Sequence, residues 1–383
     1  MICKSFHTVQ AFRVGVFTEV YRPVRNGVVT SVEMLERGLR ERGHEVMCVT
    51  PAMPGADAAE SGILRLPSLA LPTRTPYRLT LPLLSRAQRA MLENVAIVHA
   101  HSPFVTGWMA VSLARRLRVP LVFTYHTQLE HYAHYVPFER TATTFAIAKL
   151  TRGYANAASA VIVPTPSMEA HLRALGVRAR IEVVPSGIDV ARFSAGRARA
   201  YVRTQLGARA EEALVLCVGR LGREKNLELA LAAFARLESP ARLAFVGEGV
   251  ERAALERLAE RLAPGRVRFL GEQPRELLPD LYASADALLF TSASETQGLV
   301  LVESMAAGLA VVAVDTPQGR EVLGGAARLC PPDAPSLAAG LREVLADGSA
   351  ARSRGRVLAQ RFELARSTER ILEVYGSLLG QIH

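Results

Sequence analysis

The chain of 383 residues has no apolar stretch of the roughly 18 residues that a membrane-spanning helix needs. Residues 1–10 also lack the apolar core of a secretory signal peptide. Its four cysteines, Cys3, Cys48, Cys217 and Cys330, show no metal-site spacing, which is typical of thiols in a reducing cytoplasm. We therefore expect a cytoplasmic globular protein, and its length and 49% hydrophobic content suffice for two cores.

Two nucleotide-site signatures are missing as well. No Asp-x-Asp pair occurs, so the sequence predicts no dedicated Mg²⁺–diphosphate site. No G-x-G-x-x-G follows the first strand-like run, Phe12–Thr18, which excludes a dinucleotide fingerprint there. Zinc on His131 and His134 is disfavoured because no cysteine joins them, and the neighbouring tyrosines favour aromatic packing or sugar stacking instead.

Positive charge is concentrated in the first half of the chain. Residues 1–190 contain 21 Lys/Arg and 13 Asp/Glu, a net +8, whereas residues 191–383 contain 25 and 23, a net +2. This asymmetry indicates an anionic partner (nucleic acid, a membrane surface or an acidic substrate) or only an arginine-rich solvated surface. Within it, the Leu- and Arg-rich segment Leu71–Arg89 is either a basic amphipathic segment on a membrane or a surface helix covering the core.

Short apolar runs alternate with helical patterns along the whole chain, which predicts parallel, doubly wound sheets of the α/β class. Two such sets predict two Rossmann-like domains that face each other across a cleft, residues 1–190 and 191–362. A last amphipathic helix, Leu364–Leu379, has no strand after it. The expected strands are Phe12–Thr18, Glu45–Thr50, Ile97–Ala100, Leu121–Thr124, Ala160–Val163, Val183–Gly187, Leu214–Val218, Leu243–Val246, Val267–Leu270, Ala287–Phe290 and Ala310–Ala313.

The segment with most functional information lies between the strand Ala287–Phe290 and the predicted helix Leu299–Ala307. Its polar turn lies at the carboxyl end of a parallel strand, where ligands bind, and a helix start suits a phosphate. Glu295 in the turn and Glu303 in the helix can both face one ligand. Two carboxylates near a phosphate site are natural partners for the hydroxyls of a sugar and a ribose.

Three further positions follow predicted strands and are candidate ligand contacts. Arg220 and Lys225 together fit a diphosphate, although loop cations can also be plain surface charges. His126 directly follows the strand Leu121–Thr124, where it can contact substrate or line a pocket. Gly27 opens the helix predicted at Val29–Arg42, where a glycine lets a ligand approach the backbone or only makes a turn.

Several motifs together resemble the retaining GT-B glycosyltransferases of family 4, in the family's order over nearly the whole chain. They are Asn26–Ser31, Tyr125–Thr127, Val218–Arg220 with Lys225, Val246–Gly249, and Glu295 with Glu303 in the E-x7-E spacing. The resemblance implies that Arg220 and Lys225 hold the donor diphosphate, Glu303 the ribose and Glu295 the sugar hydroxyls. The backbone from Gly298 to Leu299 would cap the phosphates, His126 would face the sugar, Gly27 would lie near donor and acceptor, and residues 363–383 would cross back to the first domain.

Within the family, Ser294–Leu299 and the Tyr/His run after Tyr125 resemble bacterial diacylglycerol glucosyltransferases. This implies hexose transfer from a nucleotide sugar, UDP-glucose first, to a membrane lipid at the inner face of the cell membrane. It implies no cofactor, no metal and no nucleic-acid partner. The alternatives are a GT-B enzyme for phosphatidylinositol or a soluble sugar or sugar phosphate, with a GDP-mannose donor for example, and a non-catalytic nucleotide-sugar or nucleic-acid binding protein.

Overall fold

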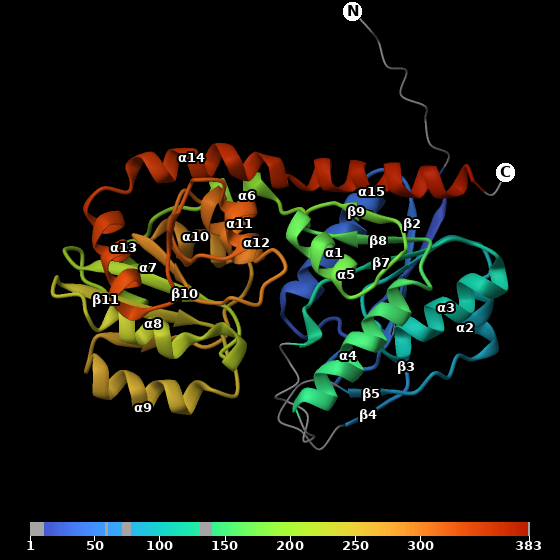
Figure 1. Cartoon of the computed structure of the whole chain (residues 1–383), viewed down its shortest axis with the longest axis horizontal. Helices are drawn as coiled ribbons and strands as arrows, with labels where there is room; N and C mark the ends of the chain where they lie inside the picture. The colour runs from blue at the N-terminus through green and yellow to red at the C-terminus, as the bar shows by residue number, and fades with distance from the viewer. Residues whose placement is uncertain (1–10, 58–59, 71–77, 131–139, 382–383) are drawn as a thin grey trace, which may run out of the picture.

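A computed structural model describes residues 11–57, 60–70, 78–130 and 140–381. In it, two sheets, each made of parallel strands, lie side by side (Figure 1). The first has the order β3-β2-β1-β6-β7-β8-β9 and the second the order β12-β11-β10-β13-β14-β15. Both confirm the predicted doubly wound parallel architecture. The strands of the first sheet are β1 (Arg13–Phe17), β2 (Glu45–Pro51), β3 (Ile63–Leu66), β6 (Val95–Ala100), β7 (Leu121–Thr124), β8 (Ala160–Val163) and β9 (Ile181–Val183). Those of the second are β10 (Ala213–Val218), β11 (Ala241–Val246), β12 (Val267–Phe269), β13 (Ala287–Phe290), β14 (Ala310–Val314) and β15 (Arg328–Cys330).

Helices cover both faces of each sheet, which explains why most residues of the strands are apolar. In β10, Leu214 and Leu216 belong to one buried cluster, while the alternating Val215 and Cys217 belong to the cluster on the opposite face. The helices of the first domain are α1 (Gly27–Arg40), α2 (Arg86–Met91), α3 (Val105–Leu117), α4 (Arg140–Ala155) and α5 (Pro166–Ala174). Those that follow are α6 (Val190–Ser194), α7 (Ala200–Gln205), α8 (Leu227–Phe234), α9 (Arg252–Leu262), α10 (Leu278–Ala283), α11 (Leu299–Ala306), α12 (Pro317–Leu323), α13 (Ala334–Ala346), α14 (Ser349–Ala359) and α15 (Leu364–Leu379).

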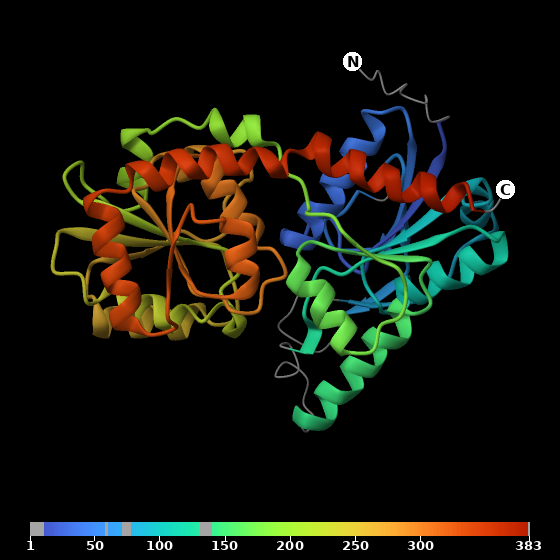
Figure 2. The same cartoon turned by 45° about the horizontal axis from the view of Figure 1, so that its top comes forward.

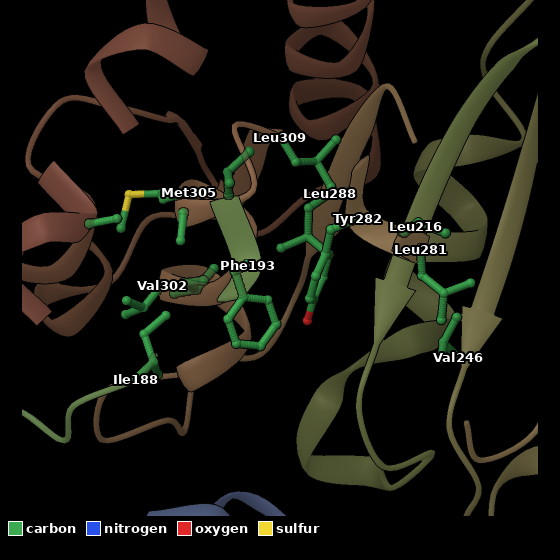
Figure 3. Close-up of a cluster of buried hydrophobic side chains, with 14 of the residues drawn as sticks. Ile188, Phe193, Leu216, Val246, Leu281, Tyr282, Leu288, Val302, Met305 and Leu309 are labelled. Atoms are coloured by element: carbon green, nitrogen blue, oxygen red, sulfur yellow. The ribbon is translucent and has the colours of Figure 1, made fainter. Parts of the chain in front are cut away.

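Helix α11 is the element of the second core that matters most for the site. Its residues Val302 and Met305 are buried in the cluster drawn in Figure 3, together with Phe193 of α6 and Tyr282 of α10. The rings of Phe193 and Tyr282 lie 6.0 Å apart between their centroids. This packing fixes the helix against the sheet and therefore fixes the turn that precedes it.

The chain crosses between the domains twice, and the two crossings are paired. The backbone N–H of Ile188 donates to Phe362 at 2.9 Å, and that of Leu364 donates to Ile188 at 2.9 Å. Helix α15 then runs over the first domain (Figure 2), where Ile371, Val374, Tyr375 and Leu378 complete its core. These two paired segments are the connections between the domains, and we refer to them together as the hinge.

Of the two alternatives for Leu71–Arg89, the surface helix that covers the core is wrong. Residues 71–77 lie outside the described residues, Arg78–Thr80 forms strand β5, paired antiparallel with β4 (Ser68–Ala70), and only Arg86–Met91 is helical. Pro82 and the capping box of Ser85 with Gln88 start this helix late, and none of its residues is buried, so it does not cover the core. Edge strand β3, with its four residues, was not predicted.

Smaller differences concern element ends. Helix α1 begins at Gly27 rather than Val29, because the Asn26 side chain accepts a hydrogen bond from the Val29 N–H at 2.9 Å and so caps the helix earlier. It ends at Arg40 rather than Arg42. Among the described helices, none has the length and apolar character that crossing a membrane requires.

Candidate active site

The site centres on the neighbouring strands β10 and β13, at the carboxyl edge of the second sheet. Two loops leave this edge, and side chains of the second bind the backbone of the first. The hydroxyl of Thr291 donates to the Lys225 carbonyl at 2.9 Å, and that of Ser292 donates to the Glu224 carbonyl at 3.0 Å. A small pocket lined by Arg220, Lys225, Thr291 and Ser292, among others, opens here.

Both predicted phosphate-binding cations are paired with carboxylates. The ammonium of Lys225 forms an ion pair with Oε1 of Glu295, which brings together two predicted site residues from different loops. The guanidinium of Arg220 donates to the buried carboxylate of Glu224 at 2.6 Å. Glu224 therefore orients Arg220, a role that the sequence reasoning missed.

Gly298 precedes helix α11 with a φ of 77°, a conformation that side-chain-bearing residues rarely adopt. A Cβ placed there would also lie 3.1 Å from the side chain of Leu301. The glycine is therefore required by the turn itself. The turn directs the first backbone N–H groups of the helix, beginning with Leu299, toward the sheet edge, where such groups suit phosphate oxygens.

Glu303 is a buried carboxylate, only 5% exposed, one helical turn into α11. It accepts a hydrogen bond from the Tyr282 hydroxyl at 2.9 Å, and Arg275 approaches its other oxygen to 4.0 Å. Burial raises the pKa of Glu303, and the nearby Arg275 charge and the Tyr282 hydrogen bond only partly oppose this rise. Arg275 is a further charged neighbour that sequence reasoning did not identify.

His126 lies across from this edge, after β7 of the first domain. Its Nε2 is 2.8 Å from Nδ1 of His101, so one imidazole donates to the other. Burial lowers the pKa of His126 to about 4 and that of His101 well below its ordinary value. Both rings are therefore neutral at pH 7.

Gly27 begins helix α1 at the carboxyl side of β1. A Cβ built on it would meet no atom within 4 Å, so neither packing nor backbone conformation requires a glycine there.

The turn before α11 also contacts the first domain directly. The hydroxyl of Thr296 donates to the His126 carbonyl at 2.8 Å, and the Thr296 carbonyl accepts from the Thr165 hydroxyl at 3.1 Å. The amide of Gln128 donates to the carbonyls of Ser294 and Glu295 at 3.3 Å each. The candidate donor loop is thus bound to the domain that carries His126.

A second cross-domain contact involves Glu321 of α12. Its carboxylate accepts from the backbone N–H of Ser167 at 3.0 Å and from the Ser167 hydroxyl at 2.7 Å, which caps the start of α5 in the other domain. Among the described residues, no group of three His, Cys, Asp or Glu side chains is suited to a metal ion. His131 and His134 lie outside those residues.

Comparison with protein families matches residues 25–192 to "Glycosyltransferase Family 4" and residues 199–357 to "Glycosyl transferases group 1". The chain is a family 4 glycosyltransferase. An alpha-monoglucosyldiacylglycerol synthase of Acholeplasma laidlawii is 30% identical over 318 residues, which cover 78% of this chain and 79% of that protein. A GDP-mannose-dependent alpha-mannosyltransferase of Mycobacterium tuberculosis is 30% identical over 317 residues, which cover 81% of each.

The fold of this glycosyltransferase is also that of known structures. HepE of Anabaena, solved with UDP and glucose, matches with a TM-score of 0.76 at 21% identity, over 96% of this chain and all of that one. The predicted GT-B architecture is confirmed.

Proposed function

We propose that this glycosyltransferase moves a hexose, glucose from UDP-glucose first, to a membrane lipid such as diacylglycerol, with retention of configuration and without a metal. The observation that carries the proposal is the contact between Lys225 and Glu295 at the sheet edge. Lys225 is suited to the diphosphate of a nucleotide sugar, and Glu295 is suited to the hydroxyls of its sugar. The diphosphate and the sugar are directly bonded in such a donor, so their binding groups should lie in contact. The 30% identity to a monoglucosyldiacylglycerol synthase supports glucose and diacylglycerol.

Binding would exchange the partners of Lys225. The donor diphosphate pairs with the ammonium of Lys225, and Arg220 supplies a second cation. The freed carboxylate of Glu295 accepts hydrogen bonds from the sugar. Gly298 and Leu299 present the start of α11 to the phosphates, and Glu303 holds the ribose. Gly27 leaves space beside the donor phosphates.

The reaction would break the bond between the anomeric carbon and the phosphate oxygen, through an oxocarbenium-like species. Arg220, Lys225 and the start of α11 stabilise the charge that develops on the departing diphosphate. The acceptor hydroxyl attacks from the same face and transfers its proton to the leaving phosphate. Neutral His126 hydrogen-bonds the sugar from the other domain, and domain contact around the donor loop limits hydrolysis.

Membrane contact would come through the β4–β5 hairpin and α2. Leu69 and Leu79 are direct cross-strand partners and are 53% and 46% exposed. Leu83 is 60% exposed, and Arg86 and Arg89 of α2 lie exposed beside it in the sequence. Exposed leucines next to arginines suit an anionic bilayer rather than nucleic acid, where aromatic stacking and phosphate-spaced cations are usual. We therefore place the protein at the cytoplasmic face of the cell membrane.

The test is release of nucleoside diphosphate from UDP-glucose, without added metal, in mixed micelles of diacylglycerol and anionic lipid. Lipid-dependent release with a glycolipid of retained configuration supports the proposal. No lipid-dependent product, or a strict metal requirement, contradicts it.

The second candidate is mannosyl transfer from GDP-mannose, favoured by the 30% identity to the mycobacterial mannosyltransferase over 81% of each chain. Its acceptors would be phosphatidylinositol or a soluble sugar. The same assay with GDP-mannose and these acceptors distinguishes the two, because the productive donor gives diphosphate release only with its own acceptor.

A further inference from the structure

The hinge receives a side chain from the candidate donor loop. Gln297 follows Glu295 by two residues, and its amide contacts Ser186 in the first crossing between the domains. Its Oε1 accepts from the Ser186 backbone N–H at 2.8 Å, and its Nε2 donates to the Ser186 carbonyl at 3.0 Å. Gln297 is 4% exposed, so water has little access to this pair of hydrogen bonds.

The chemistry of the pair restricts which side chain can form it. The N–H and C=O of one residue need an acceptor and a donor at the same time. Among uncharged side chains that keep both in one plane, the amides of Gln and Asn qualify, and Asn is one methylene shorter. Gln297 thus binds the hinge backbone much as a neighbouring strand would.

Ser186 is also held from the first domain. Its hydroxyl lies 3.0 Å from that of Ser31 on α1, and the carbonyl of the preceding Pro185 accepts from the Ser367 hydroxyl on α15 at 2.7 Å. The donor loop, α1 and α15 therefore meet at one hinge residue. Two residues away, Ile188 pairs with the second crossing at Phe362.

We propose that Gln297 is a positioning residue that couples the donor loop to the hinge and so holds the two domains in the arrangement where the loop meets His126. The proposal rests on the proposed glycosyl transfer for its catalytic consequence. Its structural consequence, the relative placement of the domains, does not depend on the substrate. Neighbouring Thr296 joins the same loop to His126, so a shift of the loop at the hinge displaces both contacts.

Small-angle X-ray scattering of the full chain tests the structural consequence. Gln297→Leu removes both hydrogen bonds and replaces the amide with an apolar side chain of similar size. We expect a larger radius of gyration than for the wild type. Gln205→Leu, an exposed glutamine of α7 in the same domain, is the control and should scatter like the wild type. Identical scattering of the Gln297→Leu protein and the wild type, with both folded by thermal melting, overturns the proposal.

Turnover separates positioning from a general packing defect. The donor contacts Arg220, Lys225 and Glu303 remain in the Gln297→Leu protein, so UDP affinity should change less than threefold. The turnover number should fall about 10- to 100-fold, the loss expected when two buried backbone groups lose their partners. Equal losses in UDP affinity and turnover would point to a damaged donor site and contradict the proposal.

The Gln297→Glu variant should regain turnover at low pH, which is not expected if the side chain of Gln297 only fills space. A protonated carboxyl has a donor and an acceptor, whereas an ionised one only accepts, and burial raises a carboxyl pKa. The titratable groups lining the cavity beside Ser186 are His99 and His101, whose pKa values burial lowers, to about 3 for His99, so they stay neutral. Turnover relative to the wild type should rise about tenfold between pH 8 and pH 5.5. A flat ratio, as expected for the control Gln205→Glu, would overturn the coupling. If no nucleotide sugar is turned over, the proposed function fails. The scattering comparison then still tests whether Gln297 holds the two domains in their relative placement.

Discussion

Lys225 and Glu295 form an ion pair that joins the loops after β10 and β13, the two strands at the centre of the second sheet. Strand β10 lies between β11 and β13, so the strand order reverses direction there, and ligands of doubly wound sheets bind at such a point. The site therefore holds a balanced pair of charges where a donor would bring negative phosphates. Under the proposed donor binding, the diphosphate would replace Glu295 as the anionic partner of Lys225, so its ammonium would stay paired.

Lys225→Ala should lower the turnover number by about 10²–10³, because one preorganised group no longer stabilises the leaving diphosphate. Lys149→Ala is the matched control, since Lys149 is exposed on α4. Initial rates of diphosphate release measure both. The melting temperature should change little in either variant, because Glu295 remains partly solvated. Near-wild-type turnover of Lys225→Ala would remove this lysine from the site.

Glu303→Gln should stabilise the protein at neutral pH while weakening nucleotide binding. Burial raises the pKa of Glu303, so the folded state binds this proton more tightly than the unfolded state. The destabilisation that Glu303 causes is absent below its pKa in the unfolded state. It grows as the pH rises through its pKa in the folded state and is complete above that pKa. The melting-temperature gain should therefore be largest at pH 7–8 and vanish near pH 4.

The same variant should bind UDP about 10- to 100-fold more weakly, because hydrogen bonds to a charged acceptor are lost. Calorimetric titration with UDP measures this. A lower melting temperature at pH 7 would show that the ion pair with Arg275 outweighs burial. Unchanged UDP affinity would show that Glu303 serves the fold and not the ribose.

The fold could be predicted from the sequence because its strands are buried on both faces and read as continuous apolar runs, as Ala287–Phe290 does. The errors lie where non-local contacts decide. Strand β3 carries Arg65 among its four residues, and it is a strand because β2 pairs with it. The β4–β5 hairpin depends in the same way on pairing across the undescribed residues 71–77.

The residues of the candidate site also fall into those that local patterns predicted and those that depend on non-local contacts. Arg220, Lys225 and Glu295 each follow a strand, and adjacent parallel strands bring their carboxyl ends together. Local patterns were therefore enough to predict that these residues lie together at the sheet edge. Gln128, Thr165 and Glu321 contact the opposite domain. Their roles depend on how the domains are oriented, and no local sequence pattern encodes that orientation.

Gly27→Ala should leave stability unchanged or slightly raised, because a Cβ there meets no protein atom and alanine favours a helix. Donor turnover should nevertheless fall at least tenfold if a ligand occupies that space. Gly153→Ala in α4 is the matched control, since its Cβ also meets nothing within 4 Å and no ligand role is proposed for it. Melting curves and initial rates measure both. Equal activity of the two variants would exclude a close ligand at Gly27.

The exposed leucines give the last prediction. Replacing Leu69 and Leu79 together by serine removes two adjacent apolar side chains from the β4–β5 hairpin without opening a core. Each leucine contributes about 1.5–3 kcal/mol when fully buried, so the double variant should lose at least tenfold in affinity for vesicles with anionic lipid. Val357→Ser is the control, because Val357 is 75% exposed on α14 of the other domain. Vesicle co-sedimentation at several salt concentrations measures both. Equal sedimentation of the two variants would show that the hairpin is not the membrane contact. Loss of vesicle binding confined to Leu69→Ser/Leu79→Ser, with unchanged diphosphate release from UDP-glucose in the presence of a soluble acceptor, would assign the hairpin to the lipid surface and not to the chemistry.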